Sequence, residues 1–566
     1  MDNRPLDLNN LTIESSELLN QIYISIKDEY LEMINNIYDE IDESIDWLVN
    51  SVLSRNNHLS NILLDICYVL LVKELTIKRK FSSVTVLNPA QQKVLKNYYF
   101  KKKINIPVIC PNYFKQIISE SLAITKSFLI NILLSCRYLC NRNKKRSKKI
   151  LTDITLIDTF IIKSMYNEGE LVDRYYNGLI RNIPKELNNK LYFLPTISSD
   201  CSIKNVVNIC QASDRLFIYK FDYLTIQDYL FSLVSPFRIK RINLSLYKIR
   251  GLNIGPILKS DFSKNISNNS SFEGILNYLF FLRLKKKHVS IRLVINWFEN
   301  QVIDRGFNMG LNSFFPNTNV IGYQGLLASY NYNFHLQPTN REYESKVIPS
   351  KIAVLGGGIK KNIEEFCDQV DTILGPAFRF NGIFDRKLRR INTSKKILIT
   401  LNNIKIENEH LLRMLLDYNE KFHSDGIYLD IKPHPTNNIN ELKNILPYWP
   451  KQFKIINKDK PIYFDNYRIL ISNASSTCLE ALAYGVSVIV IEDPWGITKN
   501  PIPDEIPMDY WSLCYTSKEL NEAINSILEK SSKKDSRDLF ILSQKIKSEY
   551  FTPVSKNSVM TLLDLI

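Results

Sequence analysis

The sequence GIYLDIKPHP at residues 426–435 and the sequence RILISNASSTCLEALAYGVSVIVI at residues 468–491 decide the fold of this chain. Each begins with a short apolar run rich in β-branched side chains, which predicts a buried strand. Pro433 ends the first strand, because proline has no N–H to give to a sheet. In the second stretch a helix is predicted from about Ser475 to Gly485, and another buried strand follows it. This alternation of strands and helices predicts a parallel sheet in an α/β fold.

Polar side chains follow the two strands, at what are predicted to be successive strand ends of one sheet. His434 stands between two prolines and can donate a hydrogen bond to a phosphate oxygen, and Lys432 adds positive charge. The predicted helix start carries the hydroxyls of Ser475, Ser476 and Thr477, which favour an anion together with the free N–H groups. A Ser or Thr at a helix start is usually a plain N-cap. The combination with His434 nevertheless predicts a site for the phosphate of a nucleotide.

Together these stretches resemble the nucleotide-binding half of GT-B glycosyltransferases. The similarity is greatest to bacterial enzymes that use CMP-activated acidic sugars, namely Kdo transferases of capsule and lipopolysaccharide assembly and sialyltransferases. It implies that His434, Ser475 and Ser476 hold the phosphate of CMP and that Glu480 lies near the ribose. The implied donor is a nucleotide sugar, most simply a CMP-linked one, with no further cofactor.

Upstream segments are similar to a less characterised group of surface-carbohydrate biosynthesis proteins. These segments are DWL at 46–48 with SRN at 54–56, DRYYNGL at 173–179, WFENQ at 297–301 and GPAFR at 375–379. The sialyltransferase motif of two acidic residues and a glycine is not reproduced, either at 407–409 or at 42–44. This departure disfavours an inverting sialyltransferase and leaves a retaining route through a carboxylate nucleophile open.

Glycosyl transfer needs a group that takes the acceptor proton or attacks the anomeric carbon. Glu299 is the leading candidate, because it follows a strand predicted at 289–295 and should lie at a carboxyl edge that faces the cleft; Asp304 stands about one turn further on. A carboxylate after a strand is more often an N-cap than a catalyst. Sugar binding is predicted for Asn300, Gln301 and Arg305, with Arg305 suited to a bidentate contact with a sugar carboxylate. The reserve candidates are Glu342, Glu344 and His335, although an exposed structural histidine is the simpler interpretation of His335.

A chain of 566 residues is too long for one core, so two domains are expected. The predicted fold class is α/β of the GT-B type, with two Rossmann-like domains that face a cleft and a helical N-terminal region. Residues 1–349 would form the acceptor-side domain, with a basic helical insert at about 112–149, and residues 350–566 the nucleotide-sugar-binding domain.

Two local segments of the second half allow further predictions. The sequence GGG at 356–358 lacks the GxGxxG spacing and is interpreted as a hinge or close-approach turn. A terminal helix at 539–551 is expected, by family resemblance, to cross back onto the first domain.

The chain has 73 basic and 58 acidic residues, a net charge of +15, which predicts an anionic partner. Aromatic side chains are not interleaved with Arg and Lys as an RNA-stacking platform requires, so no nucleic-acid partner is expected.

Nine scattered cysteines without zinc spacing predict a reducing compartment, and the N-terminus lacks the basic-then-apolar order of a signal peptide. The cytoplasm is therefore the expected location. No acidic cluster has metal-ligand spacing, which predicts transfer without a metal.

An apolar run at 127–136 is too short to cross a bilayer. A basic cluster without acidic residues follows it. This cluster consists of Arg137, Arg142, Lys144, Lys145, Arg146, Lys148 and Lys149. Residues 127–149 therefore predict peripheral docking on an anionic leaflet, and a core helix with a solvated loop is the alternative.

The function predicted from these features is transfer of Kdo or a related ulosonic acid from a CMP-sugar onto a bacterial surface glycan of capsule, O-antigen or lipopolysaccharide. One alternative is a UDP-sugar glycosyltransferase or a CDP-glycerol-type transferase of the same fold. Another is a basic scaffold or RNA-binding protein without catalysis.

Overall fold

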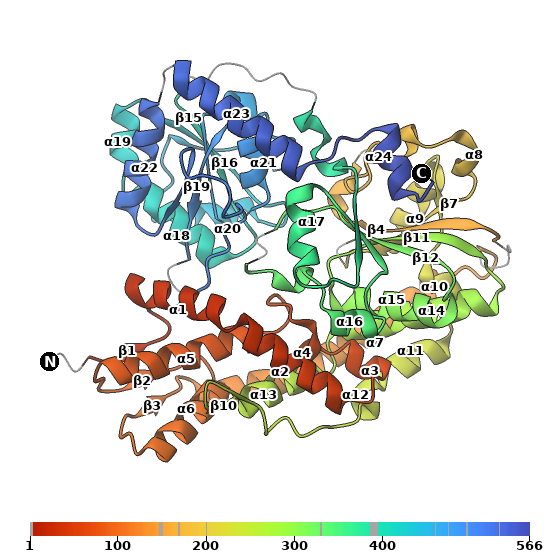
Figure 1. Ribbon diagram of the computed structural model, residues 1–566, viewed down its shortest axis with the longest axis horizontal. Coiled ribbons are helices and arrows are strands. Elements are labelled where there is room, and N and C mark those ends of the chain that lie inside the picture. The colour runs from red at the N-terminus through yellow and green to blue at the C-terminus, as the bar shows by residue number, and fades with distance from the viewer. Residues whose placement is uncertain are drawn as a thin grey trace.

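The computed structural model contains two large parallel β-sheets in two domains, with a layer of helices beside the first (Figure 1). It describes residues 4–146, 151–167, 170–199, 201–328, 331–384, 394–458, 460–473, 475–493, 496–530 and 533–565. The predicted two-domain α/β fold of the GT-B type is confirmed.

Seven parallel strands form the sheet of the first domain. In spatial order they are β14 (Asp371–Leu374), β13 (Lys351–Val354), β12 (Asn319–Gln324), β11 (Ile291–Trp297), β4 (Ile154–Ile161), β7 (Leu191–Ile197) and β8 (Leu216–Phe217). Its helices are α8 (Lys185–Asn188), α9 (Ile203–Ala212), α10 (Lys220–Tyr223), α11 (Ile226–Leu233), α12 (Ser235–Arg238), α13 (Gly255–Asn265), α14 (Asn269–Lys286), α15 (Val302–Phe314), α16 (Asn340–Glu344) and α17 (Gly357–Glu364). Two short hairpins pair β5 (Tyr166–Asn167) with β6 (Glu170–Leu171) and β9 (Lys248–Ile249) with β10 (Leu252–Asn253).

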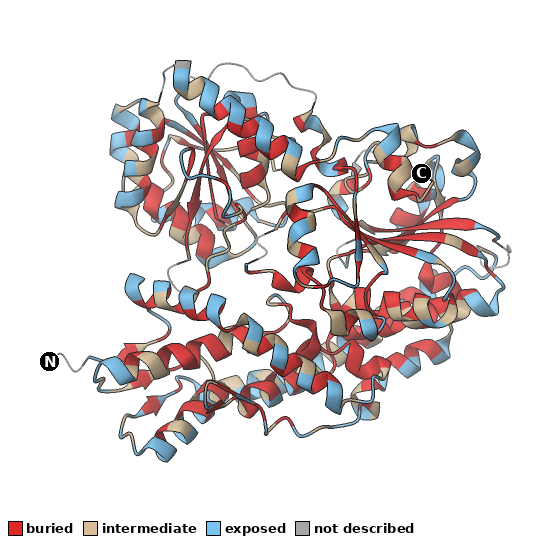
Figure 2. Ribbon diagram, viewed as in Figure 1, coloured by how far each residue is buried: buried red, intermediate tan, exposed pale blue. Residues whose placement is uncertain are grey.

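Six parallel strands form the sheet of the second domain. In spatial order they are β17 (Phe453–Ile455), β16 (Tyr428–Lys432), β15 (Lys396–Thr400), β18 (Ile469–Ser472), β19 (Ser487–Ile491) and β20 (Trp511–Cys514). Its helices are α18 (Lys405–Leu416), α19 (Asn419–Ser424), α20 (Ile439–Lys443), α21 (Thr477–Ala483), α22 (Ser517–Glu529) and α23 (Lys533–Tyr550). All residues of β18 and β19 are buried, as continuous apolar runs predict, and Figure 2 shows buried residues along the strands of both sheets.

Both sheets have a doubly wound order in which the chain starts at a central strand and fills one side before the other. The reversal occurs between β4 and β11 in the first sheet and between β15 and β18 in the second. Ligands of open α/β sheets bind outside the carboxyl ends of the strands at such a reversal. The site is therefore expected where residues that follow these four strands meet.

The predicted domain boundary at 349/350 is wrong. β13 pairs with β12, and β14 pairs with β13, so both strands belong to the first sheet. A strand after residue 350 looks the same in sequence whichever sheet it joins, because the pairing is a tertiary property. The first sheet ends at Leu374 and the second begins at Lys396.

The N-terminal layer consists mainly of helices, as predicted. It contains α1 (Ile13–Ser25), α2 (Lys27–Glu40), α3 (Ile45–Leu48), α4 (Ser51–Ser54), α5 (Ile62–Lys78), α6 (Pro89–Lys102) and α7 (Tyr113–Asn141). A small parallel sheet joins β1 (Leu6–Asp7), β2 (Val84–Thr85) and β3 (Val108–Ile109), with α6 between β2 and β3. The layer lies along the bottom of Figure 1, below the second domain and the first sheet.

The end of the chain returns to the first domain, as the family resemblance predicted. α23 packs against α21 of the second domain and α17 of the first, and α24 (Lys556–Leu562) then packs against β14. The GGG turn makes this crossing possible. A Cβ on Gly356 would lie 2.4 Å from the backbone of Glu549, and one on Gly358 would lie 2.6 Å from the Tyr550 ring. The interpretation as a close-approach turn is confirmed.

The predicted insert is a single helix, α7, followed by a short loop. By length and composition alone α7 could span a membrane, which the count of an uninterrupted apolar run did not indicate. Three arginines of the basic cluster, Arg137 within α7 and Arg142 and Arg146 after it, bind other parts of the protein. Arg137 donates to the Ser199 carbonyl at 3.4 Å, and Arg146 forms an ion pair of 3.0 Å with Asp222. Lys148 and Lys149 lie outside the described residues.

Candidate functional site

A cavity of about 180 Å³ lies between the two domains at the carboxyl ends of β15 and β18. The second domain contributes Asn402, Asn403 and Ile404 after β15, Ser475 and Ser476 after β18, and Lys499 and Pro501. The first domain contributes Leu327, Ala328, Tyr332 and Asn333, and the N-terminal layer beside it contributes His58. Because β15 and β18 flank the reversal of strand order, the cavity lies where this fold binds ligands.

The predicted serines reach this cavity, and the third hydroxyl of the motif is engaged elsewhere. Ser475 Oγ accepts the Thr477 N–H at 3.2 Å and donates to Thr477 Oγ1 at 3.0 Å. Ser475 therefore binds the first N–H group of α21 and lines the cavity as well. Thr477 is not among the described residues of the lining.

His434 lies one strand further from the reversal than predicted. β15 separates β16 from β18, so the two motifs do not follow neighbouring strands, although both lie at the carboxyl edge of the same sheet. His434 Nδ1 and Thr436 Oγ1 are 2.7 Å apart. Burial and the nearby Lys458 lower the pKa of His434 below its ordinary value. The two strand spacings between these loops amount to roughly 10 Å, so His434 and Ser475 could bind different parts of one nucleotide.

Lys432 does not point toward a phosphate site. Its Nζ donates to the carbonyl oxygens of Asn457 at 3.3 Å, Lys458 at 3.1 Å and Lys460 at 2.6 Å. The predicted phosphate contact of Lys432 is therefore wrong in this structure, because the ammonium group holds the segment after β17.

Glu480 is half-buried one turn into α21. Burial raises the pKa of its carboxyl to about 7, and the positive charge of Arg379 acts in the opposite direction. Arg379 belongs to the GPAFR segment of the first domain, so Glu480 faces the boundary between the domains. Its contact with a ribose stays a prediction.

The turn between β11 and α15 presents Glu299 at the reversal of the first sheet. Glu299 Oε1 accepts from Trp297 Nε1 at 2.7 Å, and Oε2 accepts from Gln301 Nε2 at 2.6 Å. Asn300 has a φ of 47°, a left-handed conformation that asparagine tolerates better than most residues. The half-buried carboxylate is therefore held in one orientation, and Gln301 binds it directly.

Asp304 has a structural position, and its predicted catalytic role is wrong. Its Oδ2 accepts the N–H groups of Glu299 at 3.0 Å and Gln301 at 2.9 Å, which forms a capping box at the start of α15. Burial raises the pKa of the Asp304 carboxyl to about 7. Asp304 fixes the turn that carries Glu299.

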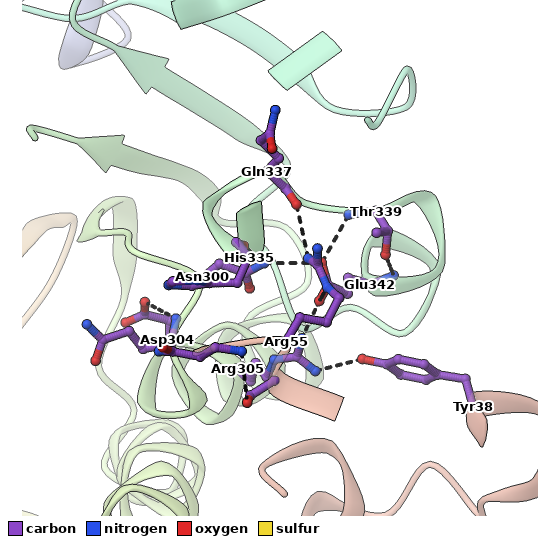
Figure 3. A network of polar contacts seen from close by, with 12 residues as sticks. Tyr38, Arg55, Asn300, Asp304, Arg305, His335, Gln337, Thr339 and Glu342 are labelled. Carbon is purple, nitrogen blue, oxygen red and sulfur yellow. Dashed lines mark hydrogen bonds and ion pairs between the residues drawn. The ribbon is translucent and has the colours of Figure 1, made fainter. Parts of the chain in front are cut away.

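Arg305 and Asn300 belong to a buried network centred on Glu342 (Figure 3). Arg305 forms an ion pair with Glu342 and donates to Tyr38 Oη at 2.7 Å. Asn300 Nδ2 donates to Glu342 Oε2 at 3.1 Å, and Arg55 pairs with the same oxygen at 2.6 Å. The predicted sugar contacts of Arg305 and Asn300 are therefore wrong, because both side chains are bound within the core.

The same network removes Glu342 from the catalytic candidates. Burial alone would raise the pKa of the Glu342 carboxyl, but Arg55 and Arg305 outweigh it and hold the pKa below its ordinary value. Glu344 is exposed beside Arg341. His335 is buried, not exposed as predicted, and burial holds its pKa well below the ordinary value.

His58 is a cavity residue that sequence reasoning missed. Its Nε2 lies 2.9 Å from Asn333 Oδ1. Burial lowers the pKa of His58 and Lys499 lowers it further, whereas the Glu299 carboxylate acts in the opposite direction. His58 follows the SRN segment at 54–56, which the resemblance had singled out. That proximity was the one signal in the sequence.

Three of the upstream segments meet at the carboxyl edge of the first sheet. The rings of Tyr175 and Trp297 have centroids 4.6 Å apart, and those of Tyr176 and Phe378 are 5.8 Å apart. The SRN segment joins them through the hydrogen-bond network of Arg55 and Asn300. The DWL segment serves a different purpose, since Trp47 Nε1 donates to the Lys240 carbonyl at 2.6 Å.

A second cavity of about 230 Å³ adjoins the first and shares Ala328 and Pro501 with it. Its other lining residues are Lys27, Asn331, Gln337, Asn362, Glu365, Phe366, Asn500, Ile502, Pro503, Asp504 and Glu505. Amides and carboxylates dominate this lining. Burial lowers the pKa of Lys27 to about 8.

No family model and no curated protein matches this sequence. Among solved structures, the chain is similar to S. aureus MnaA in a structure with UDP, with a TM-score of 0.41 and 11% identity over 73% of this chain and 98% of that one. A putative UDP-N-acetylglucosamine 2-epimerase from Listeria monocytogenes gives a TM-score of 0.44 and 11% identity over 73% and 96% of the two chains. Acinetobacter baumannii MurG gives a TM-score of 0.34 and 11% identity over 73% and 100%. These similarities concern the fold.

Proposed function

We propose that this chain is a glycosyltransferase that moves Kdo or a related ulosonic acid from a CMP-sugar onto a bacterial surface glycan of capsule, O-antigen or lipopolysaccharide. One observation carries the proposal: Ser475 and Ser476 share a cavity with His58 of the N-terminal layer, at the reversal of the second sheet. A donor bound there would have its leaving phosphate on the second domain and its sugar toward the first.

The phosphate is the part of the donor for which the cavity is best equipped. The Ser476 hydroxyl can donate to a phosphate oxygen, and the Ser475 hydroxyl would do so by turning away from Thr477. One N–H of the Asn402 amide donates to Glu407, which leaves the second for a phosphate, and His434 lies within the reach of a nucleotide. The positive charge of Lys499 at the cavity is largely offset by Glu407, with which it forms an ion pair of 2.5 Å. The Pro-His-Pro and Ser-Ser stretches support CMP as the leaving group, and hydrogen-bond donors would replace a metal there.

Glu299 is the proposed nucleophile, and His58 is the proposed base. Attack by a Glu299 oxygen on the anomeric carbon would break the bond to the phosphate oxygen and release CMP. An acceptor hydroxyl would then displace Glu299, and its proton would pass to His58. The lowered pKa of His58 keeps the imidazole neutral at pH 7, as this role requires. The product would retain the anomeric configuration.

The second cavity is the proposed acceptor site. Its amides and carboxylates can bind sugar hydroxyls by hydrogen bonds, and among the described lining residues Glu365, Asp504 and Glu505 outnumber the cation Lys27. This balance suits a neutral stretch of glycan better than an anionic one. The proposed setting is the cytoplasm, where activated sugars are made.

Nucleotide binding to the full-length protein tests the proposal. Calorimetry should show binding of CMP tighter than that of UDP. The Ser475→Ala and Ser476→Ala double variant should bind CMP at least about tenfold more weakly, because two donors to the phosphate are lost. Ser424→Ala, an exposed hydroxyl of the same domain, is the control and should bind CMP as the wild type does.

Other results would select another function. Preference for UDP would favour the UDP-sugar transferase, and binding of CDP-glycerol in place of CMP-Kdo would favour the CDP-glycerol-type reaction. Tight RNA binding without nucleotide binding would support the scaffold. Release of CMP from CMP-Kdo on addition of a glycan acceptor is the decisive assay for transfer itself.

A further inference from the structure

α7 has the reverse of the polarity that a surface helix of a globular protein normally shows. Its protein-facing side includes polar contacts along most of its length: Gln116 Nε2 donates to the Leu87 carbonyl at 2.9 Å, and Asn131 Nδ2 donates to the Ser267 carbonyl at 2.9 Å. Apolar packing against the core is confined to its last turns, at Leu134, Tyr138 and Leu139. Its buried side chains are Asn131, Ser135 and Tyr138. A helix on the surface of a water-soluble protein buries its apolar stripe and exposes its polar one.

Most of the large apolar side chains in the first five turns of α7 are exposed. Phe114 is 79% exposed, Leu122 62% and Leu133 68%, and Ile117, Ile118 and Leu129 are exposed as well. Single exposed apolar residues are ordinary, but a run of them over several turns of one helix is not. Water is a poor solvent for this face, so something else is expected to cover it.

The neighbouring helices α11 and α12 extend the apolar surface. α11 packs beside α7, with the rings of Tyr138 and Tyr229 stacked at 6.3 Å. Outward from this contact, Ile226, Leu230 and Val234 are exposed, and Phe237 follows on α12. The apolar surface therefore spans adjacent elements that lie far apart in the sequence.

The charges within the two segments that carry this surface are mostly positive. Residues 113–146 contain one carboxylate, Glu120, which pairs with Lys264 at 2.8 Å, and residues 226–250 contain one, Asp228, which pairs with Arg283 at 2.7 Å. The exposed cations of the two ranges include Lys115, Lys126, Lys144, Lys240, Arg241 and Lys248. The surface is thus apolar in its middle and positive around it, which complements an anionic bilayer.

The attachments of α7 indicate that it lies along the protein surface and is not placed to cross a bilayer. The Gln116 hydrogen bond anchors its first turn, and Tyr138 donates to Glu273 at 2.9 Å near its end. Arg146, just after the helix, pairs with Asp222. The first end is held by the N-terminal layer and the second by the first domain, so both ends stay against the protein and the helix can enter only the interface.

We propose that α7, α11 and α12 form a docking surface for an anionic lipid bilayer, with the apolar side chains in the interface and the lysines against the headgroups. The surface differs from the segment predicted from sequence, because its apolar part lies at 113–133 and 226–237 and Arg137 and Arg146 face the protein. The inference does not depend on the proposed transfer reaction. It gives the protein a fixed orientation toward a lipid-borne molecule.

Flotation of the full-length protein with lipid vesicles tests the inference. Vesicles of phosphatidylcholine with about 30% phosphatidylglycerol should carry the protein at low salt, and pure phosphatidylcholine should carry at least about tenfold less. The Leu122→Glu and Leu133→Glu double variant should lower the partition coefficient more than about tenfold. Ile77→Glu is the matched control, since Ile77 is also 68% exposed but lies on α5, and it should change binding less than about twofold.

Three outcomes would overturn the inference. One is equal flotation of the double variant, which would mean that α7 is not the contact. Another is no flotation together with a dimer in light scattering that the same variant dissociates, which would identify a second copy as the partner. The third is equal binding to neutral and anionic vesicles, which would remove the role of the lysines. Circular dichroism and thermal melting of each variant establish that it is folded.

Discussion

Glu299 and Asp304 are close in sequence, yet their surroundings assign them opposite roles. Glu299 is half-buried at the end of β11 and held by two side chains, whereas Asp304 is buried and accepts hydrogen bonds from backbone N–H groups. Sequence spacing alone cannot separate them, because a carboxylate after a strand suits a cap and a catalyst equally well.

If Glu299 is the nucleophile, Glu299→Gln should lower kcat about 10²-fold to 10⁴-fold, since an amide is a far weaker nucleophile. The melting temperature should change little, because glutamine can still accept from Trp297. Asp304→Asn is the informative comparison. It should lower stability, and it should lower kcat only indirectly, because the turn that carries Glu299 is then held less firmly. Stopped CMP-release assays with each purified variant provide the measurement, and an unchanged kcat for Glu299→Gln would exclude this role.

Glu342 is predicted to be among the most important residues for stability. Two buried guanidinium groups, those of Arg55 and Arg305, share its carboxylate. Glu342→Gln would leave both cations without a counter-charge in the core, at a cost of about 3–5 kcal/mol in the free energy of unfolding. Urea denaturation followed by circular dichroism measures this cost. Glu344→Gln, an exposed neighbour, should stay within about 0.5 kcal/mol of the wild type.

Glu480 predicts a pH dependence with a definite sign. Burial raises the pKa of its carboxyl from 4.5 to about 7, so the folded state binds this proton more tightly than the unfolded state. The stability that Glu480 contributes is complete below pH 4.5 and is lost as the pH rises through 7. Glu480→Gln cannot titrate, so it should gain about 1–3 kcal/mol relative to the wild type between about pH 5 and pH 8. Denaturation at several pH values tests this, and parallel curves for the two proteins would contradict it.

At the scale of elements, the GGG turn shows how one residue without a side chain allows two segments to meet. Gly356→Ala would push a methyl group against the Glu549 carbonyl, 2.4 Å away, and should cost about 1–3 kcal/mol. The C-terminal segment should then be cut faster by a protease. Gly357→Ala is the control, because nothing described lies within 4 Å of its Cβ, and it should leave stability unchanged or slightly higher. Equal proteolysis of the two variants would contradict the tight crossing.

The elements themselves were largely predictable, and their order in the sheets was not. Apolar runs at 396–401, 426–431 and 486–491 identified strands, because a buried parallel strand needs such a run whatever its neighbours are. The placement of β15 between β16 and β18 depends on chain crossovers that no local pattern records. For this reason Ser475 was found, while Asn402 and Asn403 beside it were missed.

The residues of the site were also hard to predict, because several of their contacts join segments that lie far apart in the sequence. His58 reaches the cavity from the N-terminal layer, far before Ser475 in the sequence. Arg305 has the chemistry of a carboxylate clamp, and its pairing with Glu342 inside the core could be seen only in three dimensions. Residue type therefore indicated which side chains have suitable chemistry, but it could not tell which of them lie at the cavity.

For the whole molecule, the cores do not follow the order of the chain. One apolar cluster joins the N-terminal layer, the first sheet, one face of the second sheet and the C-terminal α24, where Leu562 is fully buried. A separate cluster lies within the second domain alone and includes Leu520 of α22. The last residues thus belong energetically to the first domain, although they follow the second in sequence.

Leu562→Ala and Leu520→Ala, which truncate two fully buried leucines, separate these cores. Each truncation should cost about 2–5 kcal/mol, but in different places. Leu562→Ala should speed hydrogen exchange in β13 and β14, because α24 packs on that edge, and leave β19 and β20 protected. Leu520→Ala should do the reverse, since α22 packs on β19 and β20. Faster exchange in the second sheet than in β13 and β14 of the Leu562→Ala variant would contradict this assignment. It would mean that α24 stabilises the second domain, whereas the shared core places it with the first.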